Sequence, residues 1–361
     1  MANFNGQLRS NEIFSALYNM IISQQVFADN IKGTKATLVD KAREDGSLYG
    51  DTKLYYATDV LKSAPWGKDA EATNLLALHR PAAPECQAIH LDQFRQISLT
   101  VDNYLSKRAW GTEGAFSSFN SVMLGWVKDT KKVYDTTTYN AFIGTAQSSV
   151  GKQTYNITVS DLVTGGDVKG EEAARLEGMA IAEGLANLFV EMSDVNRDFN
   201  DYGNLRSYDM SDIKVIWNSK IVNKINKVDL PTIFHKEGLV EKFEEYVLPE
   251  RYFGTVNKTG GKASDSNTTV RSLIEKDYGS VHVFPGDLIP NGVSYQANET
   301  YSVDTDIVCK VVVKLPPYMS AFEVGTSFFN PKSLTENHYL TFGHNTLEYL
   351  KNYPMITVYK D

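Results

Sequence analysis

The feature that most constrains the fold is one long stretch with helical spacing, "GTEGAFSSFNSVMLGWVKDTKKVYDTTTYNAFIGTA" at residues 111–146. Apolar or small side chains recur in it at every third or fourth position, which is the spacing of one face of an α-helix. Gly144 lies close to its end and favours termination there. The spacing therefore predicts one helix over nearly the whole stretch, and the stretch contains no motif typical of a catalytic site. The predicted apolar face consists of Phe116, Phe119, Met123, Trp126, Thr130, Val133, Thr137 and Ala141.

Length and charge narrow the class of protein. A chain of 361 residues exceeds one average domain, so we expect two domains or one elaborated domain. The formal net charge of -8 argues against a protein that grips nucleic acid through a basic face. The chain starts without the charge pattern or cleavage site of a signal peptide, and no stretch is apolar enough to span a bilayer. We therefore expect no membrane partner.

Period-two alternation predicts strands at residues 52–60 and 94–102. The segment between them is mostly polar and is broken by Pro65 and Gly67, so we expect a long projecting loop that these two strands hold like the stem of a hairpin. Further strands are predicted at 213–217, 280–284, 306–315 and 355–359. Within 306–315 the alternation places Lys310 and Lys314 on the exposed face, opposite Cys309, Val311, Val313 and Leu315.

Three shorter helices complete the prediction, at residues 11–27, 171–192 and 238–248, and the glycine-rich segment 257–269 is predicted to be a surface loop. The inward face of the second helix comprises Leu176, Met179, Ile181, Leu185, Leu188 and Met192. The inward face of the third comprises Leu239, Val240, Phe243 and Tyr246. The chain as a whole is therefore expected to have an α+β fold.

The sequence contains parts of phosphate-binding and zinc-binding motifs, but none of these motifs is complete. The segments 146–153 and 256–263 contain Gly-Lys, but both lack the leading glycine and the hydroxyl residue of a phosphate-binding loop. His79, Cys86 and His90 lie close together in sequence, but no fourth ligand completes a structural zinc site. Cys86 and Cys309 are expected to be free, partly buried thiols, since two cysteines are too few for a disulfide framework. We therefore expect no enzyme activity, no cofactor and no metal.

Three segments carry a resemblance to a known family: "VFADNIKGTKATLVDKAREDGSLYGDTKLYYATDV", "FRQISLTVDNYLSKRAWGTEGAFSSFNSVMLGWVKDTKKVYDTTTYNAFIG" and "SLTENHYLTFGHNTLEYLKNYPMITVYKD". They are spread from one end of the chain to the other. Together with the order of the predicted elements, they resemble the major capsid proteins of tailed phages that have the Hong Kong 97-type (Johnson) fold. The resemblance is strongest to small short-tailed phages of the Picovirinae type.

The resemblance implies a division of the chain into the parts of that fold. It implies an N-terminal arm at residues 1–45, an extended loop at 46–95 and a peripheral domain with a spine helix at 96–145. An axial domain would follow at 146–305, and residues 306–361 would supply the returning strands of the peripheral domain and the C-terminal segment. Some relatives carry an immunoglobulin-like domain after this point, but the chain stops at Asp361 and we expect none.

The resemblance also implies a structural role, in an icosahedral or elongated head that encloses double-stranded DNA. The implied partners are other copies of the chain in hexamers and pentamers, a scaffolding protein, a portal and the packaged DNA, which is held without sequence specificity. The implied location is the virion capsid, after synthesis in the cytoplasm of a bacterial host. For contacts between subunits we expect Phe27, Tyr49, Pro65 and Trp66, because the arm and the loop have few apolar groups to bury within their own chain.

Three alternatives stay open from the sequence. A tail or minor head protein would also be associated with particles, but it would be present in few copies. An encapsulin-like shell around a cargo enzyme has the same fold, and it would differ in what the particle contains. A soluble α+β enzyme belongs to a different functional class, and it would form a small oligomer instead of a large particle.

Overall fold

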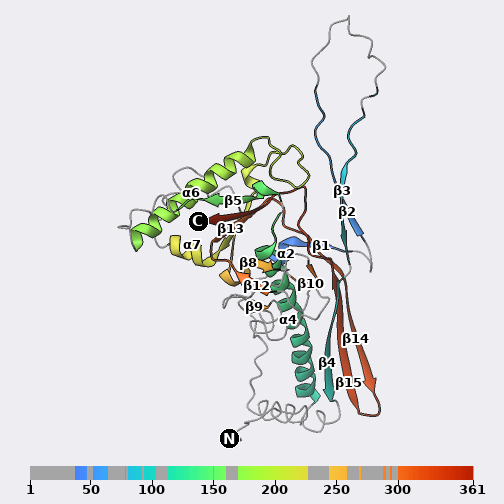
Figure 1. Cartoon of the computed structure of the whole chain (residues 1–361). Coiled ribbons are helices and arrows are strands. Elements are labelled where there is room, and N and C mark those ends of the chain that lie inside the picture. The colour runs from blue at the N-terminus through green and yellow to red at the C-terminus, as the bar shows by residue number, and fades with distance from the viewer. Residues whose placement is uncertain are drawn as a thin grey trace, which may run out of the picture.

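Helix α4 and a long sheet form the tall part of the molecule, and a lobe of mixed sheet and helix lies at one end of it (Figure 1). The structure is a computed structural model. It describes residues 37–46, 52–63, 78, 80–91, 93–102, 113–148, 150–159, 170–226, 244–257, 268–269, 288–289, 293–294 and 300–360. The predicted helix at 11–27 and the predicted strand at 280–284 lie outside these ranges.

Helix α4 (Glu113–Thr145) confirms the prediction from the 111–146 stretch, and it ends one residue after Gly144. Its 33 residues correspond to a length of about 50 Å at 1.5 Å per residue. Toward its C-terminal end the helix is buried on almost every side, with Tyr139, Phe142 and Ile143 in the core. Helix α2 (Thr37–Ala42) and the turn η4 (Glu250–Tyr252) pack against it.

The long sheet runs beside α4 and has the strand order β1-β14-β15-β4 (Figure 1). Strands β14 and β15 form an antiparallel hairpin that the sequence patterns did not predict, and β4 pairs with β15. In β4 the predicted alternation holds, since Val101 is buried while Ser98 and Thr100 are exposed. The strands of this sheet are β1 (Arg43–Asp45), β14 (Tyr318–Asn330), β15 (Thr335–His344) and β4 (Gln93–Asp102).

The lobe contains a five-stranded mixed sheet of order β5-β16-β13-β6-β7. Its strands are β5 (Thr154–Ile157), β16 (Met355–Lys360), β13 (Ile307–Val312), β6 (Lys214–Asn218) and β7 (Glu244–Leu248). Helix α6 (Glu171–Ser193) packs on one face through residues such as Ile181, Leu185 and Leu188. The C-terminal end of α4 covers the other face through Tyr139 and Phe142. Because both faces are covered, the central strand β13 is buried along its whole length.

This two-sided burial overturns one prediction. Lys310 lies in the middle of β13 and is 0% exposed, whereas the alternation of its segment placed it on an open face. Lys314, beyond the end of the strand, is exposed as predicted. An alternating pattern does indicate a strand, but it cannot tell whether a second layer will cover the polar face.

Two helix predictions also need correction. Helix α6 begins at Glu171 as predicted, but Met179 is 45% exposed and is not on the inward face. The predicted helix at 238–248 is wrong over Glu244–Leu248, which form strand β7 beside β6. In β7, Tyr246 and Leu248 are buried while Val247 is exposed, so this segment has the period of a strand.

The projecting hairpin has a different stem from the predicted one. Strand β2 (Thr52–Ala57) pairs with β3 (Glu85–His90), and β4 belongs to the long sheet. The second strand of the stem therefore ends at His90, before the second predicted strand begins. The remaining elements are short: α7 (Ser219–Asn226), η2 (Gly151–Gln153), η3 (Met210–Asp212), β8 (Gly254–Asn257), β9 (Thr268–Thr269), β10 (Leu288–Ile289), β11 (Val293–Ser294) and β12 (Thr300–Val303). Two of these, β8 and β9, include ends of the predicted loop at 257–269 and pair with β12.

Candidate interaction surfaces

The β2–β3 hairpin has one face on the body of the molecule and one face open. On the inner face Ile89 is buried, and the Gln87 side chain joins the hairpin to the chain near the C-terminus. Gln87 Nε2 donates to the carbonyl of Tyr349 at 2.9 Å, and Gln87 Oε1 accepts from the backbone N–H of Lys351 at 2.9 Å. These bonds fix the orientation of the ribbon and thereby decide which face is open.

The outer face of the hairpin carries apolar side chains in cross-strand register. Leu54 is 51% exposed and lies opposite Ala88, while Tyr56 is 64% exposed and lies opposite Cys86. Leu61 and Leu78, beyond the ends of the stem, are also exposed. Exposed apolar groups that form a continuous patch are typical of surfaces that contact another molecule.

A charged tether fixes the loop where it leaves the stem. The Asp59 carboxylate accepts from Arg197 Nη1 at 2.7 Å and from the backbone N–H of Leu205 at 2.9 Å. The backbone N–H of Leu205 and the Arg197 guanidinium lower the pKa of Asp59 to about 2. Next to it, Arg206 Nη2 donates to the carbonyl of Thr58 at 2.7 Å. These contacts therefore anchor Thr58 and Asp59, just after strand β2, to the lobe.

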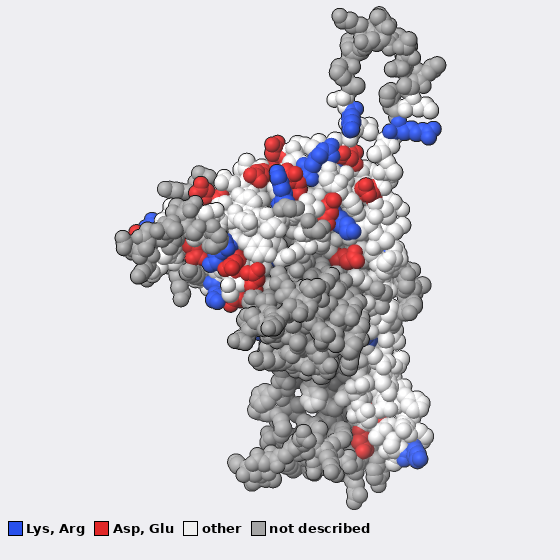
Figure 2. All heavy atoms as spheres, viewed as in Figure 1, with Lys and Arg blue, Asp and Glu red and all other residues white. Residues whose placement is uncertain are grey.

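The outer half of the β14–β15 hairpin also exposes apolar side chains, and they lie on both faces of the ribbon because consecutive residues of a strand point to opposite faces. Phe328 is 63% exposed, and Phe329, Val324 and Leu334 are exposed as well. Leu334 adopts a left-handed backbone conformation (φ 56°) in the turn between the strands. In Figure 2 the middle of the flank that corresponds to these strands carries almost no charge, acidic and basic groups lie at its far end, and the lobe mixes basic and acidic side chains.

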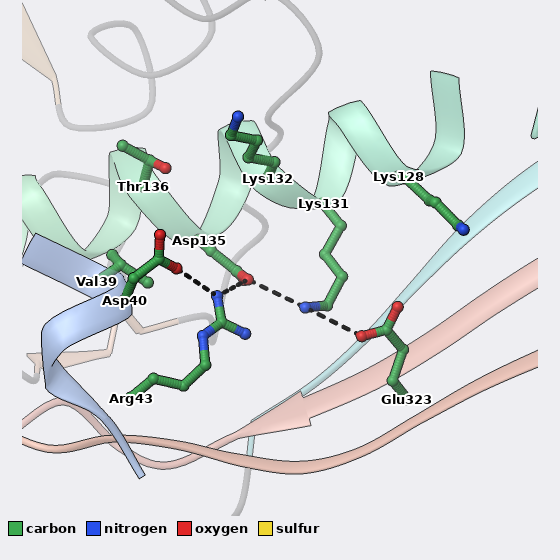
Figure 3. A pocket seen from close by; sticks show the side chains of 9 residues that line it. All are labelled: Val39, Asp40, Arg43, Lys128, Lys131, Lys132, Asp135, Thr136 and Glu323. Carbon is green, nitrogen blue, oxygen red and sulfur yellow. Dashed lines mark hydrogen bonds and ion pairs between the residues drawn. The ribbon is translucent and has the colours of Figure 1, made fainter. Parts of the chain in front are cut away.

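A buried carboxylate joins the segment before the loop to α4 and the long sheet (Figure 3). Asp135 of α4 is almost fully buried and accepts from Arg43 Nη2 at 3.4 Å and Lys131 Nζ at 3.1 Å. It also accepts a short hydrogen bond of 2.6 Å from the hydroxyl of Tyr318 in β14. Burial and the charge of Asp135 raise the pKa of Tyr318 well above its usual value. This network makes α4, β1 and β14 one unit.

The segment 146–153, which failed the test for a phosphate-binding loop, has a structural role. Asp201 accepts from Ser148 Oγ at 2.7 Å, from Gln153 Nε2 at 2.6 Å and from the hydroxyl of Tyr349 at 2.5 Å. Lys152 pairs with Asp198 at 2.7 Å. These polar groups are used to hold the end of α4 against the lobe.

The structure describes only some of the residues that the sequence analysis singled out. Phe27, Tyr49, Pro65, Trp66 and His79 lie outside the described residues. Cys86 and His90 both project from the exposed face of β3, and His90 Nδ1 lies 2.8 Å from the hydroxyl of Thr52. Cys309 is free and fully buried. Within the described ranges no cluster of His, Cys, Asp and Glu is arranged to hold a metal ion, and no helix there is long and apolar enough to cross a membrane.

Sequence reasoning missed Leu54, Tyr56, Phe328 and Phe329 as contact candidates. The alternation in 52–60 predicts that Leu54 and Tyr56 lie on the same side of a strand. That pattern is the one signal in the sequence, and it does not indicate whether this side is buried or open. Only the pairing with β3 shows that this side is open.

No protein-family model matches the sequence, and no curated protein is similar to it at a significant level. Solved structures are similar in fold. A chain of the "Capsid structure of Staphylococcus phage Andhra" aligns with a TM-score of 0.59 at 12% identity, over 94% of this chain and 87% of that one. This chain has the fold of a phage capsid chain. A chain from the native bacteriophage P68, in a structure of its "head fiber and inner core protein gp22", aligns with a TM-score of 0.58 at 10% identity, over 89% of this chain and 83% of that one.

Proposed function

We propose that this chain is the major capsid (head) protein of a tailed phage, and that its copies assemble into a closed shell around double-stranded DNA. The observation that carries the proposal is the likeness of fold to a phage capsid chain over 94% of the length. The exposed apolar faces of the two hairpins are consistent with it, because a shell subunit keeps surface for its neighbours.

The parts of the Hong Kong 97-type fold are assigned as follows. Residues 1–45 are the N-terminal arm, 46–95 the extended loop, 96–145 and 306–361 the peripheral domain with α4 as its spine helix, and 146–305 the axial domain. Helix α4 lies beside the long sheet, which supports the assignment of both to the peripheral domain. Strand β13 pairs with β6 and strand β16 pairs with β5. Residues assigned to the peripheral domain and residues assigned to the axial domain therefore share one sheet.

The outer face of the β2–β3 hairpin is the main proposed contact with a neighbouring subunit. A two-stranded ribbon is marginally stable by itself, so its open apolar face gains most from a neighbour. Copies of the chain form hexamers and pentamers by this contact and by others. The scaffolding protein and the portal act during assembly, in the bacterial cytoplasm, and the finished shell is part of the virion.

Expression of the full chain, alone and with a candidate scaffolding protein, tests the proposal. We expect closed particles in negative-stain electron micrographs and a megadalton species in sedimentation. A small defined oligomer under both conditions would overturn it and favour the soluble enzyme. Particles from infected cells should contain DNA, whereas a cargo protein in its place would favour an encapsulin-like shell.

Trp66 is proposed to dock on an adjacent subunit. Replacing Trp66 with Ala should reduce particle yield and heat resistance, and the matched variant Trp66→Phe, which keeps an aromatic ring, should retain most of both. Unchanged yield and heat resistance in Trp66→Ala particles would contradict this role.

A further inference from the structure

Two pockets lie next to each other along helix α4. The first, of about 330 Å³, is lined by residues from α2, β1, α4 and β14 (Figure 3). The second, of about 370 Å³, lies between α4 and the β14–β15 hairpin. Lys128 lines both pockets. We call the two together the α4–β14 groove.

The charges in the groove are not balanced. The first pocket contains Arg43, Lys128, Lys131 and Lys132 against Asp40, Asp135 and Glu323. Arg43 pairs with Asp40 and Asp135, and Lys131 pairs with Asp135 and Glu323, so all three carboxylates already have cationic partners. Lys128 and Lys132 form no ion pair with any residue in the described part of the chain.

A buried hydroxyl beside these lysines also lacks a partner. Thr136 lies one turn beyond Lys132 on the same side of α4 (Figure 3) and lines the first pocket. The residue is 7% exposed, and its Oγ1 has no hydrogen-bond partner among the described residues. An unpaired buried hydroxyl costs free energy, and a bound acceptor would recover it.

The second pocket is apolar. Val127 is buried at its wall, and the uncharged residues Gly325, Thr326 and Ser327 of β14 and Tyr339 and Leu340 of β15 line the rest of it. His338 lines it too and is 3.9 Å from Glu336. The groove therefore changes along its length from a basic end to an apolar end.

We infer that the α4–β14 groove is a docking site for an acidic, partly apolar peptide segment of an assembly partner. Carboxylates complement Lys128 and Lys132, and an apolar side chain of the same segment fills the space beside Val127 and Leu340. A nucleic-acid backbone offers phosphate but no aliphatic group for the apolar end, so a polypeptide fits the groove better. The inference goes beyond the shell role: the chemistry of the occupant follows from this groove, and its identity as an assembly partner rests on the proposed function.

Fluorescence anisotropy on the unassembled full chain tests the inference. The probe is a labelled peptide rich in Glu with a pair of Leu at its centre. The variant Lys128→Glu with Lys132→Glu should weaken binding by about tenfold or more, equivalent to about 1.4 kcal/mol. The matched control, Lys62→Glu with Lys332→Glu, makes the same charge change at two exposed sites outside the groove and should leave binding unchanged.

Two further comparisons separate the ends of the groove. Leu340→Ala should weaken binding of the Leu-containing peptide and leave binding of a peptide with Ser at those positions unchanged. Added salt should weaken binding of both peptides, because the lysine contacts are screened. Equal loss of binding in both double variants would overturn the proposal, since the attraction would then be a matter of net charge. Binding of a DNA duplex that depends on Lys128 and Lys132, with no binding of the peptide, would also overturn it and assign the site to phosphate.

Discussion

The ammonium group of Lys310 is enclosed between the lobe sheet and the end of α4. Its Nζ donates to the carbonyl of Ala146 at 2.7 Å and to the hydroxyl of Thr357 at 2.7 Å, and neither partner is a carboxylate. Burial lowers the pKa of Lys310 to about 7. The lysine therefore holds a proton near neutral pH less firmly in the folded chain than in the unfolded one.

This lowered pKa gives the free energy of unfolding a dependence on pH. Between pH 7 and 10.5, the usual pKa of a lysine, the unfolded chain binds the proton that the folded chain has lost, so the free energy of unfolding rises with pH across that window. The slope should reach about 1.4 kcal/mol per pH unit for this one proton. Lys310→Met should remove it. Urea unfolding at several pH values up to about pH 9, where lysine and not tyrosine titrates, measures the difference.

The exposed neighbour Lys314 provides the control. Lys314→Met should keep the slope of the native protein, since that ammonium group stays in water. An equal slope in the native chain and in Lys310→Met would contradict the role given to Lys310.

Asp135 is the second residue with a large expected effect. Asp135→Ala should destabilise the chain by about 2–4 kcal/mol, because Tyr318 and Lys131 then lose a buried partner. Glu323→Ala removes the other carboxylate that pairs with Lys131, but that carboxylate is exposed and the loss should stay below about 1 kcal/mol. Denaturant unfolding of both variants gives the comparison, and equal losses would show that burial of Asp135 does not matter.

At the scale of elements, the close approach of helix α4 to the turn η4 depends on one glycine. A Cβ on Gly144 would lie 1.9 Å from the backbone oxygen of Tyr252, which no side-chain adjustment can relieve. A Cβ on Gly125, on the same helix, would meet no described residue within 4 Å. The two positions therefore separate the cost of close approach from the helix propensity of alanine.

We predict opposite effects for the two substitutions. Gly144→Ala should lower the free energy of unfolding by about 2 kcal/mol or more, since η4 must move away from the helix. Gly125→Ala should raise it by about 0.5–1 kcal/mol, because alanine restricts the unfolded chain and favours the helix. Thermal or denaturant unfolding measures both, and a neutral Gly144→Ala would show that the contact between α4 and η4 is loose.

At the scale of the whole molecule, each of the two hairpins exposes its own group of apolar side chains. The β2–β3 hairpin presents Leu54 and Tyr56, and the tip of β14–β15 presents Phe328 and Phe329. Two such groups on one chain allow each copy to contact more than one neighbour, as a closed shell requires.

The double variant Leu54→Ser, Tyr56→Ser tests this arrangement. Both side chains are exposed, so the isolated subunit should keep its stability, while particle yield should fall strongly because the hairpin loses its apolar contact. Val190→Ser on α6 removes an apolar group of similar exposure outside the hairpins and should assemble normally. Sedimentation separates particles from subunits, and normal assembly of the double variant would remove the hairpin from the interface.

The sequence by itself determined the elements whose pattern follows from local periodicity. Helix α4, strands β4, β6 and β16, and the start of α6 lie where spacing predicted them, because helix and strand periods are properties of the chain. The incomplete motifs were also readable from spacing alone.

Only the tertiary structure decided how those elements are layered. Lys310 is buried because α4 returns over the second face of the sheet, and Met179 is exposed because the other face of α6 meets the core. The partner of β2 is β3 and not β4, which leaves Leu54 and Tyr56 facing outward. These outcomes depend on contacts between residues far apart in sequence, and periodicity within a segment holds no information about what will pack against it.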